Sequence, residues 1–116
     1  MRNYLAVYVG STEAGEDVDW TDDFAGRFMD AWGAWAKTNE AAIVDGGTPI
    51  GKTKRADRNG ISGMKNMITG YVIVRAESHD EAAKMFDGHP HTAMLPGTWI
   101  EVMECLDMSE VREVPA

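Results

Sequence analysis

Apolar positions that recur every second residue mark the strands of this chain. Residues 3–9 alternate between two apolar faces and are rich in β-branched and aromatic side chains, which is typical of a strand. The same pattern recurs over residues 67–78, the strongest strand in the sequence, and over residues 97–106. The run AAIVDGG at residues 41–47 predicts a short strand that a Gly-Gly turn ends. Four strands are therefore expected.

A period of three to four residues predicts a helix over residues 22–38. Thr21 is a suitable N-cap, and Asp22 and Asp23 place negative charge in the first turn, where the helix dipole favours it. The apolar stripe of this helix consists of Phe24, Phe28, Trp32 and Trp35. A stripe at this spacing indicates an amphipathic helix.

A second helix is expected directly after residues 67–78. Ser78 and Glu81 have the S-x-x-E spacing of a capping box, and residues 82–86 supply an apolar side. Gly88 and Pro90 predict the end of this helix.

The segment from Thr48 to Asn66 has no regular apolar period and contains five Lys and Arg residues. It predicts either a long loop or a loose hairpin. Long irregular connections in small domains often form lids or binding loops.

The order of these elements, β-α-β-β-α-β, predicts a ferredoxin-like α+β fold, in which an antiparallel sheet carries two helices on one face. Residues 1–108 are expected to form this single domain, and residues 109–116 an acidic, frayed tail.

The sheet face without helices is expected to be apolar. It would carry either Tyr4, Ala6 and Tyr8 or the alternate residues of that strand, together with Tyr71, Ile73, Trp99 and Met103. A patch of this size is typical of an interaction site, and two open faces can bury each other in a symmetric pair. We therefore expect a homodimer with clefts near the interface between the two sheets.

Composition narrows the possible partners. The chain has 116 residues and a net charge of −8, which repels nucleic acids and anionic membrane surfaces. No apolar run is long enough to span a bilayer, and no cleaved signal is visible at the N-terminus. Cys105, the single cysteine, excludes an internal disulfide. A cytoplasmic protein is expected.

Five sequence segments resemble, in order, the YCII-related family: AWGAW (31–35), VDGGTPIG (44–51), TGYVIVRAES with DEA after His79 (69–82), GHPH (88–91) and IEV (100–102). The resemblance implies a ferredoxin-like dimeric α+β barrel. It also implies a cleft in which some members, resembling small hydrolases or lyases, use a His–Asp pair on phenolic or other small substrates.

The resemblance carries over to single residues in three places. His91 matches the family's Pro-His position, Asp45 the D-G-G turn, and Glu101 the Glu of the last strand. Two features of the family are missing, since residues 20–30 contain no His and the DGPF motif is replaced by RADRNGISGMKN. The resemblance therefore implies a fold and a cleft without carrying over an activity.

His91 is the leading candidate for chemistry, with Asp87, Glu101 or Asp45 as the carboxylate that orients it. An imidazole titrates near neutrality and could act as general acid or base. The competing interpretation is that His89 and His91 are polar residues at a helix end. A His-x-His metal site would need Asp87 or Glu101 as a third ligand, and we expect neither a metal nor a cofactor.

The ligand-binding candidates are Asp45, Trp32, Tyr71 and His89. For Asp45 the alternative is a role in a tight turn, and for Trp32 a place in the core. The sequence leaves two functions open. One is a protein that binds a small molecule at a homodimer cleft without catalysis, and the other is a small cleft enzyme that uses His91.

Overall fold

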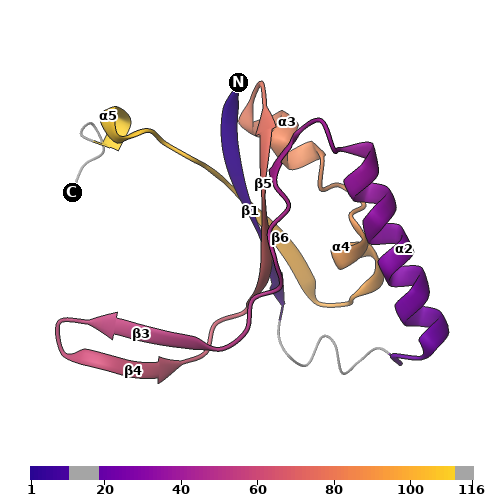
Figure 1. Cartoon of the computed structure of the whole chain (residues 1–116), viewed down its shortest axis with the longest axis horizontal. Coiled ribbons are helices and arrows are strands. Elements are labelled where there is room, and N and C mark those ends of the chain that lie inside the picture. Colours follow the sequence, from indigo (N-terminus) through magenta and orange to yellow (C-terminus); the bar gives the residue numbers. More distant parts are fainter. Residues whose placement is uncertain (11–18, 112–116) are drawn as a thin grey trace.

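The computed structural model describes residues 1–10 and 19–111. Its main sheet has the order β2-β5-β1-β6, and all neighbouring strands are antiparallel (Figure 1). The strands are β1 (Arg2–Gly10), β2 (Ile43–Asp45), β5 (Ile68–Ala76) and β6 (Thr98–Glu104). The predicted ferredoxin-like α+β architecture is confirmed, with β1 and β5 at the centre of the sheet.

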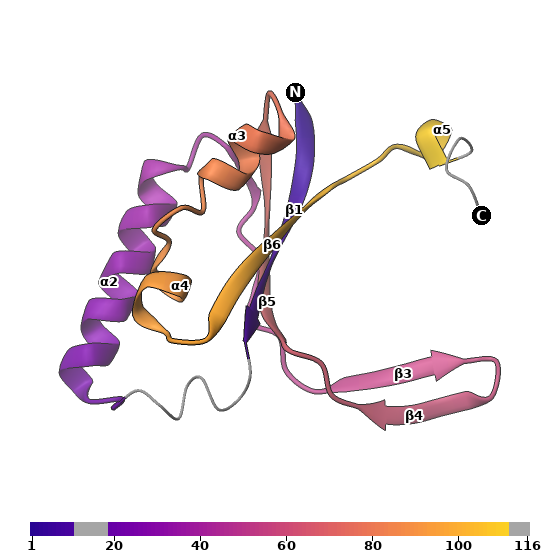
Figure 2. The ribbon, with the colours of Figure 1, turned by 180° about the vertical axis from the view of Figure 1, so that it is seen from behind.

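Three helices cover one face of this sheet: α2 (Asp22–Thr38), α3 (His79–Lys84) and α4 (Pro90–Met94) (Figures 1 and 2). The predicted caps are present, because Thr21 Oγ1 accepts a hydrogen bond from the Phe24 amide at 3.1 Å and Ser78 Oγ accepts one from the Glu81 amide at 3.1 Å. Helix α4 was not predicted. Pro90, interpreted as a stop signal, is the first residue of α4, where its missing N–H costs nothing.

The core lies between the helices and the sheet. Its members on the two central strands are Tyr4, Ala6, Tyr8, Val72, Val74 and Ala76. Because side chains alternate along a strand, Leu5, Val7, Val9, Tyr71 and Ile73 face the opposite side, and Trp99, Glu101 and Met103 of β6 face it too. We call this the open face, since no helix covers it (Figures 1 and 2). The second of the two predicted sets from β1 therefore faces outward.

The segment between β2 and β5 forms a hairpin, one of the two predicted possibilities. Strands β3 (Thr53–Asp57) and β4 (Gly60–Met64) pair in register from Thr53 opposite Met64 to Asp57 opposite Gly60. Asp57 Oδ1 accepts a hydrogen bond from the Asn59 amide at 2.8 Å, and Gly60 has a φ of +115°, which suits the turn. The hairpin projects away from the main sheet (Figure 1).

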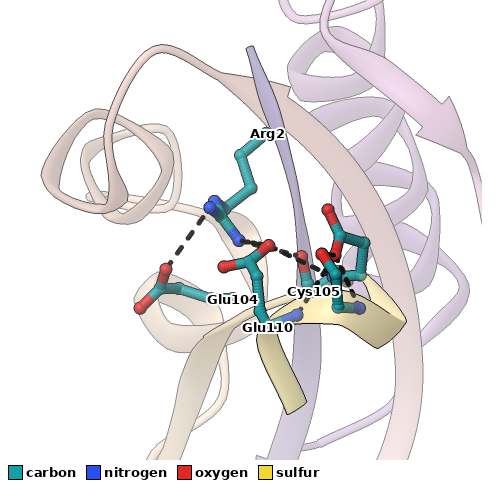
Figure 3. Close-up of polar contacts among 6 residues, drawn as sticks. Arg2, Glu104, Cys105 and Glu110 are labelled. Atoms are coloured by element: carbon teal, nitrogen blue, oxygen red, sulfur yellow. Dashed lines mark hydrogen bonds and ion pairs between the residues drawn. The ribbon is translucent and has the colours of Figure 1, made fainter. Parts of the chain in front are cut away.

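The end of the described chain is held by the N-terminal strand. Arg2 Nη1 donates to Glu110 Oε1 at 2.8 Å, and Arg2 Nε lies 3.8 Å from Glu104 Oε2 (Figure 3). Glu110 belongs to α5 (Met108–Val111), so residues 109–111 of the predicted tail are helical. Residues 112–116 of that tail lie outside the described residues, as do residues 11–18. Within the described ranges, no helix is long and apolar enough to cross a membrane.

Candidate functional site

A cleft of about 570 Å³ opens between α2, α4 and one end of the sheet. It is lined by Tyr8, Gly10, Trp20, Phe28, Met29, Trp32, Gly46, Gly47, Thr48, Pro49, Thr69, Gly70, Tyr71, His91, Leu95 and Thr98. No side chain among these carries a formal charge at neutral pH. The volume is in the range of small-molecule sites, and the aromatic lining is typical of them.

The aromatic wall arises where the stripe of α2 meets the last helix-facing residue of β1. The rings of Tyr8 and Trp32 lie 4.8 Å apart, and Trp32 continues to Phe28 at 5.5 Å between centroids. Gly70, opposite Tyr8 on β5, makes room for this arrangement, because a Cβ there would lie 3.3 Å from the Tyr8 ring and 3.4 Å from the Thr48 carbonyl oxygen. Trp32 thus serves both the cleft and the core, whereas Trp35 packs on Phe86 and donates its Nε1 proton to the Met85 carbonyl.

Helix α4 places two histidines beside this wall. His89 is its N-cap, and its Nδ1 accepts a hydrogen bond from the His91 amide at 3.0 Å. In a neutral His89 ring the proton must therefore sit on Nε2, which lies 3.4 Å from the Tyr8 hydroxyl oxygen and donates to it. Because the Tyr8 oxygen accepts this bond, its own hydroxyl proton is not used in it, and Tyr8 lines the cleft.

Burial keeps these groups neutral. His89 is completely buried among the rings of Tyr8, Trp32, Trp35 and Phe86, and this desolvation lowers its pKa to about 4, with a smaller effect from His91. Burial also lowers the pKa of His91, against the opposing effect of the Val9 and Trp99 backbone, and raises the pKa of Tyr8 to about 12. At pH 7 the site therefore offers uncharged imidazoles and an uncharged phenol.

His91 lines the cleft, and backbone groups orient its ring. Its Nε2 lies 3.0 Å from the Val9 carbonyl oxygen and must donate to it, so the lone pair of the neutral ring sits on Nδ1. The Trp99 backbone is the second polar group beside the ring. Nδ1 is the ring atom that can accept a proton or a hydrogen bond.

The structure does not bring the predicted carboxylates to His91. Asp87 is exposed before α4 and lies outside the cleft lining. Glu101 lies on the open face, where its Oε2 accepts the Trp99 Nε1 proton at 2.8 Å. Asp45 is exposed and closes a turn by accepting the Gly47 amide at 2.9 Å, as the turn interpretation expects. The group that orients His91 is the Val9 carbonyl.

The structure places some of the predicted ligand-binding residues in the cleft lining and others outside it. Trp32 and Tyr71 line the cleft, although the Tyr71 side chain belongs to the open face of the sheet. His89 lies behind the cleft as a cap and a support for Tyr8. Among residues 1–10 and 19–111, no group of three or more His, Cys, Asp or Glu side chains is arranged to hold a metal ion.

Sequence reasoning missed Tyr8 as a site residue, since its strand is apolar on both faces. It also missed the capping role of His89. The signal for the second was present, because a polar residue followed directly by Pro is a common helix start, with Pro at the first helical position.

Comparison with solved structures finds a similar fold in 5-chloro-2-hydroxyhydroquinone dehydrochlorinase (TftG) from Burkholderia phenoliruptrix AC1100, in complex with 2,5-dihydroxybenzoquinone. The two chains are 20% identical, with a TM-score of 0.50, and the match covers 85% of this chain and 90% of the dehydrochlorinase. At this identity the likeness shows the fold, a ferredoxin-like α+β barrel fold. No protein-family model and no curated protein sequence matches the chain.

Proposed function

We propose that this chain is a YCII-related protein that binds a planar hydroxylated aromatic molecule in the cleft. The observation that carries the proposal is the combination, in one cleft lining, of an aromatic wall with a phenol, Tyr8, and a neutral imidazole, His91. The dehydrochlorinase that shares the fold binds 2,5-dihydroxybenzoquinone, a molecule of that shape.

The shape and polarity of the cleft favour a neutral ligand of this kind. The rings of Trp32 and Phe28 offer surfaces for offset or edge-on packing of a flat molecule. Among the described residues of the lining there is no charged side chain that would balance an anionic or cationic group. A phenolic hydroxyl can donate to Nδ1 of His91, and a second oxygen can accept from Tyr8.

Substitution of Tyr8 by Phe tests the donor. We expect Tyr8→Phe to weaken the binding of 1,4-hydroquinone by about five- to tenfold, because one hydrogen bond contributes about 1 kcal/mol. The dissociation constant is measured by isothermal titration calorimetry. Tyr4→Phe is the matched control, since Tyr4 is equally buried, stacks on His79 and lies outside the cleft lining.

The same experiment separates aromatic recognition from simple hydroxyl binding. Cyclohexane-1,4-diol carries the two hydroxyls of hydroquinone without the flat ring, so it should bind at least about tenfold more weakly. Equal affinity for the two diols, or an equal loss of affinity in the Tyr4 and Tyr8 variants, would contradict the proposal.

A cleft enzyme is the second candidate, and the neutral His91 ring in the cleft lining favours it. A neutral imidazole oriented through Nε2 can take a proton from a phenolic hydroxyl as a general base. On this alternative, the wild type releases chloride from 5-chloro-2-hydroxyhydroquinone by loss of HCl, and His91→Gln reduces the rate by at least about tenfold. Chloride release is followed directly, and unchanged release in the variant would exclude His91 as the base.

We further propose that the chain forms a homodimer through its open face. The exposed fractions of Trp99, Met103 and Ile68 are 41%, 39% and 38%, and these residues lie beside the more buried Val7 and Val9. Covering this patch with the same patch of a second copy would remove it from water.

The single thiol, Cys105, is exposed, which is compatible with the reducing cytoplasm as the location of the protein.

A further inference from the structure

The β3–β4 hairpin stands apart from the rest of the molecule. Every residue from Lys54 to Thr69 is exposed, and Ile61 has an exposed fraction of 76%. The two arms of the hairpin are joined at its base, where Asn66 Nδ2 donates to Thr53 Oγ1 at 3.0 Å. A two-stranded hairpin without other packing is only marginally stable in water and leaves two strand edges unpaired. Packing against another surface is therefore expected to stabilise this hairpin.

The direction of the hairpin points to the occupant of the open face. The hairpin and α5 both project on the side of the sheet that the helices leave uncovered (Figures 1 and 2). A five-residue strand is about 17 Å long, whereas two stacked sheets lie about 10 Å apart. A hairpin of this length therefore reaches past the sheet of a copy docked on the open face.

Charge identifies the surface that the hairpin would meet. Residues 52–65 contain five of the eleven Lys and Arg residues and a single carboxylate, Asp57, which already pairs with Arg55 at 3.1 Å. The rest of the chain holds six cations against eighteen carboxylates. Residues 98–111 contain Glu101, Glu104, Asp107 and Glu110 and no Lys or Arg. Arg2 of β1 pairs with Glu104 and Glu110, so four carboxylates in this segment meet one cation. The basic hairpin and this acidic segment are complementary.

We propose that the β3–β4 hairpin is an arm that clasps the acidic β6–α5 segment of a second copy of this chain. The inference rests on the proposed homodimer through the open face and adds the segment that holds it. In a twofold dimer the contact is made twice, once by each arm. Ile61 and Met64 then supply apolar contacts within a rim of charge pairs.

Reversal of hairpin charges tests the clasp. We expect Lys54→Glu combined with Arg58→Glu to weaken the dimer by at least about tenfold and to reduce the salt dependence of its dissociation constant. Charges at the rim of an interface contribute both to its affinity and to the dependence of that affinity on salt. The control is Lys37→Glu with Lys84→Glu, which makes the same change of charge on the helix side of the sheet. Sedimentation equilibrium over a range of protein and salt concentrations gives the constants.

Hydrogen exchange of the wild type adds a measurement that needs no variant. We expect the amides of residues 53–64 to exchange more slowly above the dimer dissociation constant than below it. A monomeric wild type at all concentrations overturns the homodimer and the clasp together. A dimer that is equally stable in both charge variants, with hairpin exchange independent of concentration, overturns the clasp alone and leaves the homodimer standing. Neither result bears on hydroquinone binding, which is measured separately.

Discussion

Substitution of Gly47 by Ala is expected to lower the free energy of unfolding by about 3 kcal/mol or more. Gly47 has a φ of +72°, and a Cβ at this position would lie 1.7 Å from the carbonyl oxygen of Tyr71 and 2.6 Å from its carbon. Both atoms belong to the backbone of the central strand β5, so neither can move aside without disturbing the sheet. The turn after β2 must shift instead, which removes one wall of the cleft and the hydrogen bond from the Ile50 amide to the Thr69 carbonyl.

Two matched glycines separate the causes of this loss. Gly88 has the same φ of +72° but open space where a methyl group would project, so Gly88→Ala should cost only the left-handed strain of about 1 kcal/mol. Gly46 has neither a positive φ nor a neighbour within 4 Å, and Gly46→Ala should change stability by less than about 0.5 kcal/mol. Urea denaturation at 25 °C measures all three, and a Gly47 variant no less stable than the Gly88 variant would contradict the clash.

The sequence was enough to predict the elements whose start and end signals lie within or next to the segment itself. Helix α2 begins and ends where the Thr21 cap and the apolar stripe predict, because both signals lie within the segment itself. The sequence could not predict which side chains of β1 point towards the helices, because a strand has a period of two and the residues on both of its sides are apolar. Only the packing of α2 on Tyr8 decides it.

The candidate site was predicted less completely, because proximity in sequence is a poor guide to proximity across a turn. Asp87 is four residues before His91, but the start of α4 turns His91 towards the sheet and leaves Asp87 in solvent. Glu101 is two residues from Trp99 and follows it onto the open face, on the opposite side of the sheet from the α4 histidines. A backbone carbonyl, that of Val9, takes the place of the expected carboxylate, and no sequence pattern identifies such a partner.

Acidification from pH 7 to pH 4.5 is expected to destabilise the protein, with His89 alone contributing about 2 kcal/mol. The pKa of His89 falls from 6.5 to about 4 on folding, because the neutral ring is buried among aromatic side chains. Between pH 6.5 and about pH 4, His89 binds a proton in the unfolded chain but not in the folded chain, so falling pH favours unfolding. The contribution is fully present above pH 6.5 and is lost progressively as the pH falls towards 4. The lowered pKa of His91 acts in the same direction.

His89→Asn provides the control for this titration. An Asn side chain can still accept the His91 amide as an N-cap but has no ionisable group in this range. The variant is expected to be less stable at pH 7, since the ring contacts of His89 are lost, but to have the flatter dependence of unfolding free energy on pH. Carboxylates titrate in both proteins and cancel in the comparison. NMR titration of the wild-type His89 ring should give a midpoint near 4; a midpoint near 6.5, or parallel pH profiles for the two proteins, would show that burial does not hold this ring neutral.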